Sequence, residues 1–276
     1  MFPQYDFCRE ICGDTADIKL LLPPGVESHS YDPTPADIYD IVNCDVFIYT
    51  GPEMESWVQT ILEGVGGDVE VIDLSQCVEV VCSEDEHDEH GNHGHEHHHH
   101  HDYDPHIWTS PYNAVLMTKY IYEHLSVISP QYSKMYKENC DNYCAKLMRL
   151  DEQLFDIAKN AKRDTLVFGG RFAFGYLTDR YSFHWQAAYD SCSHEAEPSV
   201  AKVAELIDYV RENEIPVVYY EELTDPTVAR TIAAESGAKL LLLHSCHNLS
   251  KDDLDSGMTY ISIMGNNIKN LGEGLC

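Results

Sequence analysis

The chain has 276 residues, enough for two lobes that each bury a core. It carries 18 Lys and Arg against 47 Asp and Glu, a net charge of -29, which argues against nucleic acid and anionic membrane surfaces as partners and favours cationic ligands. No apolar run approaches the roughly 18 residues that span a bilayer, so we expect no direct membrane insertion by this chain.

The first 128 residues are predicted to form an α/β lobe in which strands and helices alternate. Apolar runs predict strands at 18–22, 45–49 and 69–74, and helical spacing predicts helices at 35–43 and 53–62. Such alternation predicts a parallel sheet with helices on both faces, in which ligands bind beyond the carboxyl ends of the strands. His29 follows the first predicted strand, although a lone loop histidine is more often solvated than a metal ligand.

Residues 83–103 form an acidic segment that holds nine of the sixteen histidines and is predicted to be a solvated loop. Neutral imidazole is the commonest metal ligand, and carboxylates attract divalent cations. Without a fixed geometry, the loop should bind several ions weakly, and zinc, copper and nickel better than manganese. An internal affinity tag is the alternative interpretation. The histidines of this weak metal-binding loop are His87, His90, His93, His95, His97, His98, His99, His100 and His101.

A long helical pattern separates the two halves of the chain. Apolar residues at helical spacing continue over 110–128, and a second pattern without a helix breaker runs from about 131 to 162. A helix of that second length would measure on the order of 45 Å, too long for one small lobe. We therefore predict three parts: an N-terminal lobe over 1–128, a linking helix over 129–163 and a C-terminal lobe over 164–276.

The C-terminal lobe repeats the alternation of strands and helices. Strands are predicted at 165–168, 183–187, 217–220 and 239–243, and helices at 172–180, 199–214, 225–236 and 258–272. Polar groups follow three of these strands, namely Arg171, then Glu221 with Glu222, and then His244 with His247. Because ligands of doubly wound lobes bind at the carboxyl ends of their strands, these groups should face the cleft between the lobes, where both lobes could hold a metal.

Two segments carry motifs that resemble those of a known family. Residues 25–37, GVESHSYDPTPAD, look like a GxExHxYxPxPxD motif whose histidine, here His29, is a metal ligand. Residues 104–108, DPHIW, look like a DPHxW motif with a second ligand, here His106, directly after a His-rich loop. The chain therefore resembles the zinc- and manganese-binding solute receptors of ABC importers over essentially its whole length. Further matches lie at 173–176, 197–199 and 260–267.

This resemblance implies a fold and a metal site. The fold would be α/β, with two doubly wound parallel-sheet lobes joined by one long helix and Zn²⁺ held in the cleft between them. Arg171 stands where the family has its third ligand, and a guanidinium cannot coordinate zinc. The implied zinc ligands are therefore His29, His106 and His247. Further candidates for binding the metal or orienting its ligands are His244, Glu27, Glu222 and Arg171, the last paired with a carboxylate such as Glu197 or Glu222.

The resemblance also implies the partner and the place of action. The chain would act outside the cytoplasm as a monomer, in the periplasm or on the outer face of the cell membrane, and would deliver zinc to the membrane permease of a metal ABC importer. The full-length protein would be lipid-anchored. The given chain shows no signal segment, and the strand with which the family opens before residues 2–7 is almost absent. We expect no enzymatic activity.

Other functional classes stay open beside the zinc receptor. A receptor for manganese or another divalent metal, or an adhesin, would share these features, although imidazole ligands favour zinc over manganese. A zinc-dependent hydrolase would use the same ligand types, with Glu221 or Glu222 as general base, but the sequence has no HExxH motif. Equilibrium dialysis with zinc, combined with a hydrolase screen, would separate these classes.

Ten cysteines are present, and none forms a CxxC pair. Cys192 and Cys246 each follow a serine just after a strand end in the C-terminal lobe, and we predict a disulfide between them. Such a bridge would limit the motion of the loop that carries His247. Two unpaired thiols in a reducing compartment are the alternative.

Overall fold

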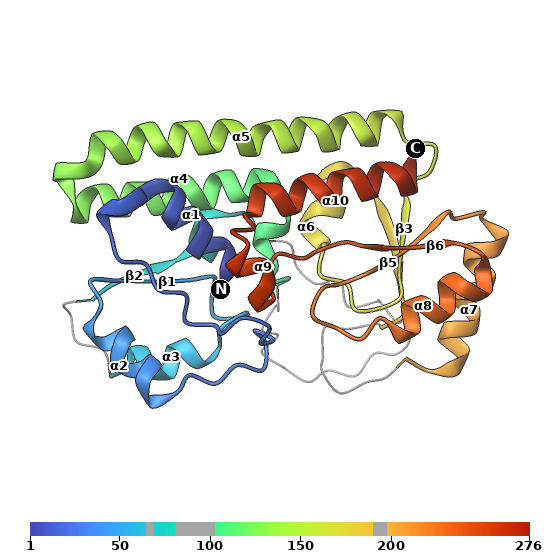
Figure 1. Ribbon diagram of the computed structural model, residues 1–276, viewed down its shortest axis with the longest axis horizontal. Coiled ribbons are helices and arrows are strands. Elements are labelled where there is room, and N and C mark those ends of the chain that lie inside the picture. The colour runs from blue at the N-terminus through green and yellow to red at the C-terminus, as the bar shows by residue number, and fades with distance from the viewer. Residues whose placement is uncertain (65–68, 81–102, 190–197) are drawn as a thin grey trace, which may run out of the picture.

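The computed structural model describes residues 1–64, 69–80, 103–189 and 198–276, which form two α/β lobes along one long helix (Figure 1). The histidines predicted for the weak metal-binding loop all lie outside the described residues, as do Glu197 and Cys192. The predictions that concern them therefore stay predictions.

The first lobe contains a small parallel sheet. Strands β1 (Val46–Tyr49) and β2 (Glu70–Asp73) pair in parallel. Helices α2 (Pro35–Asn43) and α3 (Trp57–Leu62) pack on β1 through an apolar cluster centred on Phe47. Helices α1 (Phe2–Cys12) and α4 (Pro111–Ile128) lie on the other side, toward the long helix (Figure 1).

The start of α2 fixes the chain just after His29. The Thr34 Oγ1 accepts a hydrogen bond from the Asp37 backbone N–H at 3.3 Å, and the Asp37 carboxylate accepts one from the Thr34 backbone N–H at 2.9 Å, which is a capping box. The Tyr31 hydroxyl donates to the same carboxylate at 2.8 Å. Pro35 lies in the first helical turn, where its missing N–H is not needed. The SYDPTPAD stretch is therefore held by its own side chains.

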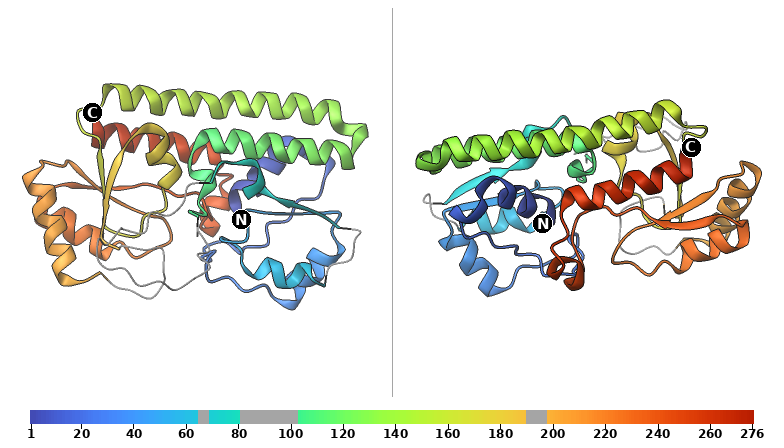
Figure 2. Two further views of the ribbon diagram at one scale, coloured as in Figure 1. Left: turned by 180° about the vertical axis from the view of Figure 1, so that it is seen from behind. Right: turned by 45° about the horizontal axis from the view of Figure 1, so that its top comes forward.

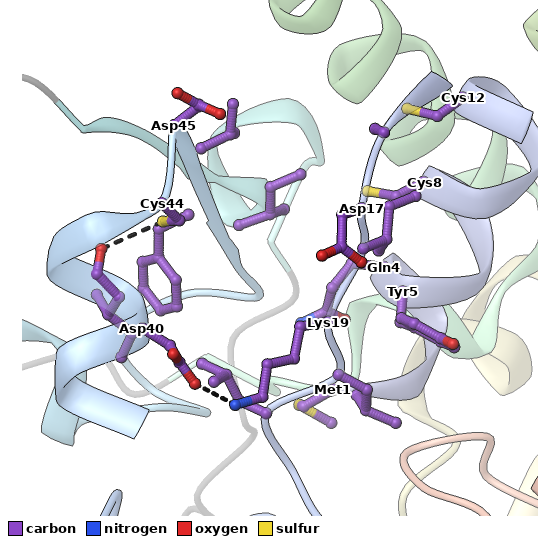
Figure 3. A pocket seen from close by; sticks show the side chains of 18 of the residues that line it. Met1, Gln4, Tyr5, Cys8, Cys12, Asp17, Lys19, Asp40, Cys44 and Asp45 are labelled. Carbon is purple, nitrogen blue, oxygen red and sulfur yellow. Dashed lines mark hydrogen bonds and ion pairs between the residues drawn. The ribbon is translucent and has the colours of Figure 1, made fainter. Parts of the chain in front are cut away.

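The prediction of a paired strand at 18–22 is wrong. These residues form no regular element, and none of the described strands pairs with them. They line one side of a cavity of about 790 Å³ whose other side is formed by β1 and the end of α2 (Figure 3). An ion pair between Lys19 and Asp40 bridges the two sides (Figure 3). Only Leu22 of these residues is buried in the main core, while Ile18 and Leu20 are half-buried against it and Lys19 is exposed. The apolar pattern therefore indicated contact with the core but supplied no pairing partner.

The second lobe contains a four-stranded parallel sheet in the order β4-β3-β5-β6. Its strands are β3 (Thr165–Phe168), β4 (His184–Ala187), β5 (Val217–Tyr220) and β6 (Lys239–Leu242). Helices α7 (Val200–Glu212) and α8 (Thr227–Ser236) cover one face, and α6 (Gly175–Tyr181) and α10 (Tyr260–Leu275) cover the other (Figure 2). The short helix α9 (Lys251–Asp255) precedes α10. Most elements lie within two or three residues of their predicted ranges; α6 begins later, at Gly175, and α3 at Trp57.

Helix α5 (Ser133–Asn160) runs along both lobes (Figures 1 and 2). It packs against α4 and α1 of the first lobe and against α10 and α6 of the second. With 28 residues it is about 42 Å long, close to the length expected from the sequence. One continuous apolar core extends from α1 and α4 across α5 to α10.

A buried carboxylate joins three helices of this core. Asp6 on α1 accepts hydrogen bonds from the Tyr143 hydroxyl of α5 at 3.1 Å and from the Tyr260 backbone N–H of α10 at 3.0 Å. Burial raises the pKa of Asp6 to about 6, although both hydrogen bonds favour its ionised form. The contacts place the last helix of the chain against the first.

Candidate metal centre

Two histidines from distant parts of the first lobe meet at the cleft. His29 lies in the loop after the Pro23-Pro24-Gly25 turn, and His106 directly precedes a short 3-10 helix (Ile107–Thr109). Their Nε2 atoms are 3.2 Å apart. Two ligands of a tetrahedral zinc ion, each about 2.0–2.1 Å from the metal, have nitrogen atoms about 3.3 Å apart. The pair already has the spacing of two zinc ligands.

Asp104 orients the ring of His106. Its Oδ1 lies 2.7 Å from His106 Nδ1 and also accepts the His106 backbone N–H at 2.9 Å. Burial alone would raise the pKa of Asp104, but hydrogen bonds from His106 and from the Gly175 backbone outweigh it and lower that pKa. An ionised Asp104 requires a proton on Nδ1, which leaves the Nε2 lone pair pointing toward His29. The sequence alone did not identify this role, although Asp104 belongs to the DPHxW motif.

His247 is held in the same way by Glu222. Its Nδ1 lies 2.9 Å from Glu222 Oε1 and 2.8 Å from Ser245 Oγ. Its Nε2 is buried without a hydrogen-bond partner among the described residues, and it lies 3.9 Å from Glu27 Oε2. Burial alone would lower the pKa of His247, but the hydrogen bond to Glu222 and the surrounding negative charge raise it. A buried unpaired imidazole nitrogen is suited to a metal.

The loop that carries His247 is tied to both histidine loops of the first lobe. The Asn248 side chain donates to the Pro23 and Val26 carbonyls at 2.7 and 2.8 Å. The Trp108 indole N–H donates to the Ser245 carbonyl at 2.6 Å. These hydrogen bonds bring the turn before His29, the segment after His106 and the loop of His247 into one fixed assembly.

His244 occupies a different position from His247. Its Nδ1 lies 3.2 Å from Glu222 Oε1 and 3.0 Å from the Cys246 backbone nitrogen. Within the described part of the chain, the side chains that line the small cleft cavity do not include His244. His244 is therefore bonded within its own loop, while Glu222 holds both imidazoles. Burial opposes the ionisation of Glu222, but the histidine charges and hydrogen bonds keep its pKa well below the usual value.

The cleft cavity is small, about 30 Å³, and it collects the candidate groups. Glu221 lines it, and its Oε1 is buried without a hydrogen-bond partner among the described residues. Burial and the charge of Glu222 raise the pKa of Glu221 to about 8, while the charge of Arg171 opposes that shift. The residues that line the cavity are Glu27, Ser28, His29, His106, Arg171, Ala173, Glu221, Ser245 and His247.

Only part of a metal site is assembled in this conformation. Among the described residues, no group of three or more histidine, cysteine or carboxylate side chains is already placed to hold one ion. The pair of His29 and His106 is at ligand spacing, and His247 and Glu221 face the same cavity from the second lobe. Arg171 lines this cavity, and its charge acts on Glu221. Its predicted pairing with Glu197 or Glu222 stays a prediction.

The other predicted features lie apart from this centre. Cys246 is a fully buried free thiol, and its predicted disulfide partner lies outside the described residues. The large cavity beside β1 is lined by Cys8, Cys12 and Cys44, and no described histidine lines it (Figure 3). None of the helices in the described ranges is long and apolar enough to cross a membrane.

Comparison with known proteins places this chain in a family. The family model described as zinc-uptake complex component A, periplasmic (ZnuA), matches residues 1–274. The chain is 37% identical over 276 residues to the high-affinity zinc uptake system protein ZnuA of Bacillus subtilis (strain 168), covering 99% of this chain and 85% of that protein. It is 34% identical over 279 residues to the zinc-binding lipoprotein AdcA of Streptococcus pneumoniae serotype 4 (strain ATCC BAA-334 / TIGR4), covering 99% of this chain but only 54% of AdcA.

Solved structures agree with these sequence relatives. The Zn(II)-bound ZnuA-like domain of Streptococcus pneumoniae AdcA superimposes with a TM-score of 0.82 at 30% identity, covering 99% of this chain and 96% of that chain. The metal-dependent lipoprotein YcdH of Bacillus subtilis gives a TM-score of 0.84 at 32% identity, with the same coverage. A laminin-binding protein of Streptococcus agalactiae, at 23% identity, shares the fold. The chain belongs to the ZnuA family, the periplasmic component A of zinc-uptake complexes.

Proposed function

We propose that the chain captures Zn²⁺ in the cleft between its lobes and delivers it to the membrane permease of an ABC importer. The observation that carries this proposal is the 3.2 Å separation of the His29 and His106 Nε2 atoms, with Asp104 fixing the His106 ring. Members of the family are zinc-binding receptors for uptake and not enzymes. The net charge of -29 gives a surface potential that attracts a cation.

His29, His106 and His247 are the proposed ligands. All three line the cleft cavity, and Asp104 and Glu222 lie at hydrogen-bond distance from the Nδ1 atoms of His106 and His247. Imidazole nitrogen favours zinc over manganese, which prefers carboxylate and carbonyl oxygen. For one ion to contact all three, the His247 side chain would have to come closer to the other two, because no group of three such side chains among the described residues is already placed to hold an ion. His244 would orient its loop without touching the metal.

The site of action is proposed from the relatives. The family description places the component in the periplasm, and AdcA is named as a lipoprotein. The chain would act outside the cytoplasm, held there by a lipid anchor, as a monomer that docks on the permease. The likeness to a laminin-binding protein extends only to the fold, so an adhesive role has no separate support here.

The test is zinc binding by the full chain in competition with a chelator of nanomolar affinity, which removes zinc from the weak sites of the acidic loop. His29→Ala and His247→Ala should each lose more than the roughly 10- to 100-fold that an orienting partner contributes. His184→Ala is the matched control, because His184 is exposed on β4 away from the cleft, and it should bind as the wild type does. A wild-type chain that does not compete with the chelator would refute the receptor. If His244→Ala weakens binding more than His247→Ala, the ligand assignment is wrong.

A further inference from the structure

A tetrahedral zinc ion held by three histidines keeps a fourth position for water or for another side chain. Three carboxylates lie near His247, namely Glu27, Glu221 and Glu222. Their surroundings differ, and that difference decides which one can coordinate.

Glu222 is already fully used. Its Oε2 accepts the Ser245 backbone N–H at 2.7 Å, and its Oε1 accepts the Ser245 hydroxyl at 2.6 Å. The same Oε1 lies 2.9 Å from His247 Nδ1 and 3.2 Å from His244 Nδ1. It is not among the described residues that line the cleft cavity. Moving Glu222 to a metal would break four contacts and release the ring that it holds.

Glu27 supports the other side of the cleft. Its Oε1 accepts the His29 backbone N–H at 3.3 Å and lies 3.4 Å from the Ser28 hydroxyl. Its side chain keeps 30% of its surface exposed. Glu27 therefore holds the turn of His29 and remains accessible to water, which satisfies its oxygens without a metal.

Glu221 differs from Glu222 and Glu27 because one of its oxygens is buried without a hydrogen-bond partner among the described residues. It follows β5 directly, so it projects from the second lobe into the same cavity as His29, His106 and His247. Its Oε1 is buried and has no hydrogen-bond partner among the described residues. A buried polar atom without a partner destabilises the fold unless something satisfies it. The buried Nε2 of His247 also has no hydrogen-bond partner among the described residues, and Glu221 and His247 line the same cavity.

We propose that Glu221 is the fourth zinc donor, which completes a site of three imidazoles and one carboxylate. This assignment rests on the proposed function and adds a ligand to it. One ion would then satisfy both buried atoms at once. Arg171 takes the role of a positioning residue, because its guanidinium lies in the same cavity and its charge acts on Glu221. A carboxylate donor also reduces the charge of the bound ion, which three neutral imidazoles cannot do.

The experiment compares Glu221→Gln with Glu27→Gln in the full chain, with zinc affinity measured against the same chelator. Both variants replace a carboxyl group that lines the same cavity by an amide of nearly the same shape, so the pair compares two candidate oxygen donors at one site. Glu221→Gln should weaken zinc binding about tenfold or more, whereas Glu27→Gln should weaken it less, because an amide oxygen can still accept the His29 backbone N–H. Glu235→Gln, at an exposed ion pair with Arg211 outside the cavity, is the control and should bind as the wild type does. X-ray absorption at the zinc edge should show an oxygen donor in the wild type that is replaced or lost only in Glu221→Gln.

Equal losses in the two variants, or an unchanged zinc spectrum in Glu221→Gln, would overturn the assignment. Thermal unfolding of the metal-free variants is the folding control, and the isosteric Glu221→Gln should unfold no earlier than wild type, because it removes a buried carboxylate with an unpaired oxygen. If the wild-type chain itself fails to bind zinc, the receptor function fails, and this outcome is distinct from the loss of one donor.

Discussion

Asp104 Oδ1 lies 2.7 Å from Nδ1 of His106, two residues later in the chain. The same carboxylate accepts the backbone N–H of Gly175, which belongs to α6 of the second lobe. The Tyr176 hydroxyl also donates to the Asp104 carbonyl at 2.9 Å. One acidic residue therefore sets the tautomer of a proposed ligand and contacts the opposite lobe. Changes at this contact should alter zinc binding without touching the metal.

Asp104→Asn should weaken zinc binding about 10- to 100-fold, because an amide cannot hold the His106 proton on Nδ1 as a carboxylate does. Chelator competition measures the effect. Asp164→Asn is the control, since Asp164 forms an exposed pair with His184 at 3.9 Å, away from the cleft. Unchanged affinity in Asp104→Asn would show that the ring needs no such partner.

Gly175→Ala should also weaken binding, through a steric effect. A Cβ at this position would overlap with Asp104 Oδ2 and force the carboxylate to move. Gly265→Ala, on α10 with open space around it, is the control. We expect about a tenfold loss of zinc affinity for Gly175→Ala and none for Gly265→Ala. Full affinity in Gly175→Ala would mean that Asp104 can shift without displacing His106.

Zinc binding should weaken as pH falls from about 8 to about 6, because each imidazole must lose its proton before it can coordinate. The raised pKa of His247 means that protonation begins to compete above the ordinary value of 6.5. The folding stability of the metal-free protein depends on pH in the opposite direction from its zinc affinity. Protonated His247 contributes stability that is fully present below pH 6.5 and is lost as pH rises through the folded pKa of His247. Dissociation constants over this range, in wild type and His247→Ala, test the coupling. An equally steep pH dependence in both proteins would exclude His247.

Deleting residues 83–102 should leave the tight site intact and lower the number of zinc ions bound per chain, because the deletion removes nine histidines that can each ligate zinc. Calorimetry separates the tight and weak phases. Loss of the tight phase in the deletion would contradict this division between the cleft and the loop.

Asp151→Ala should reduce the free energy of unfolding by about 3 kcal/mol without changing zinc affinity. Asp151 is a buried residue of α5 that pairs with Arg180 of α6 through two hydrogen bonds of 2.6 and 2.9 Å, and it accepts the Tyr181 hydroxyl at 2.7 Å. Its removal leaves a half-buried guanidinium without its partner. Chemical denaturation measures the loss, and Asp141→Ala, which removes an exposed helix pair on the same α5, should cost far less. Equal losses of unfolding free energy in Asp151→Ala and Asp141→Ala would mean that burial does not strengthen the pair of Asp151 and Arg180.

The sequence by itself predicted the alternating strands and helices, the long α5 and the loops that carry His29, His106 and His247. These features are local: apolar spacing records which face of an element is buried, and motifs such as SYDPTPAD contain their own capping contacts. The strand predicted at 18–22 failed for the same reason. Its apolar residues encode burial, but a paired strand also needs a neighbour, and none of the described strands lies beside it.

Only the tertiary structure distinguished Glu221 from Glu222 and assigned Asp104 to His106. Two adjacent glutamates after a strand look equivalent in sequence, yet the chain enters a turn at Glu222, just after the strand, and the two side chains have different neighbours. One therefore meets Ser245 and the two imidazoles of its loop, and the other enters the cavity shared with His29. Likewise, residues 29, 106 and 247 are far apart in the chain. Their meeting depends on long-range packing along α5 and on hydrogen bonds such as Asn248 to Pro23, which no local pattern encodes.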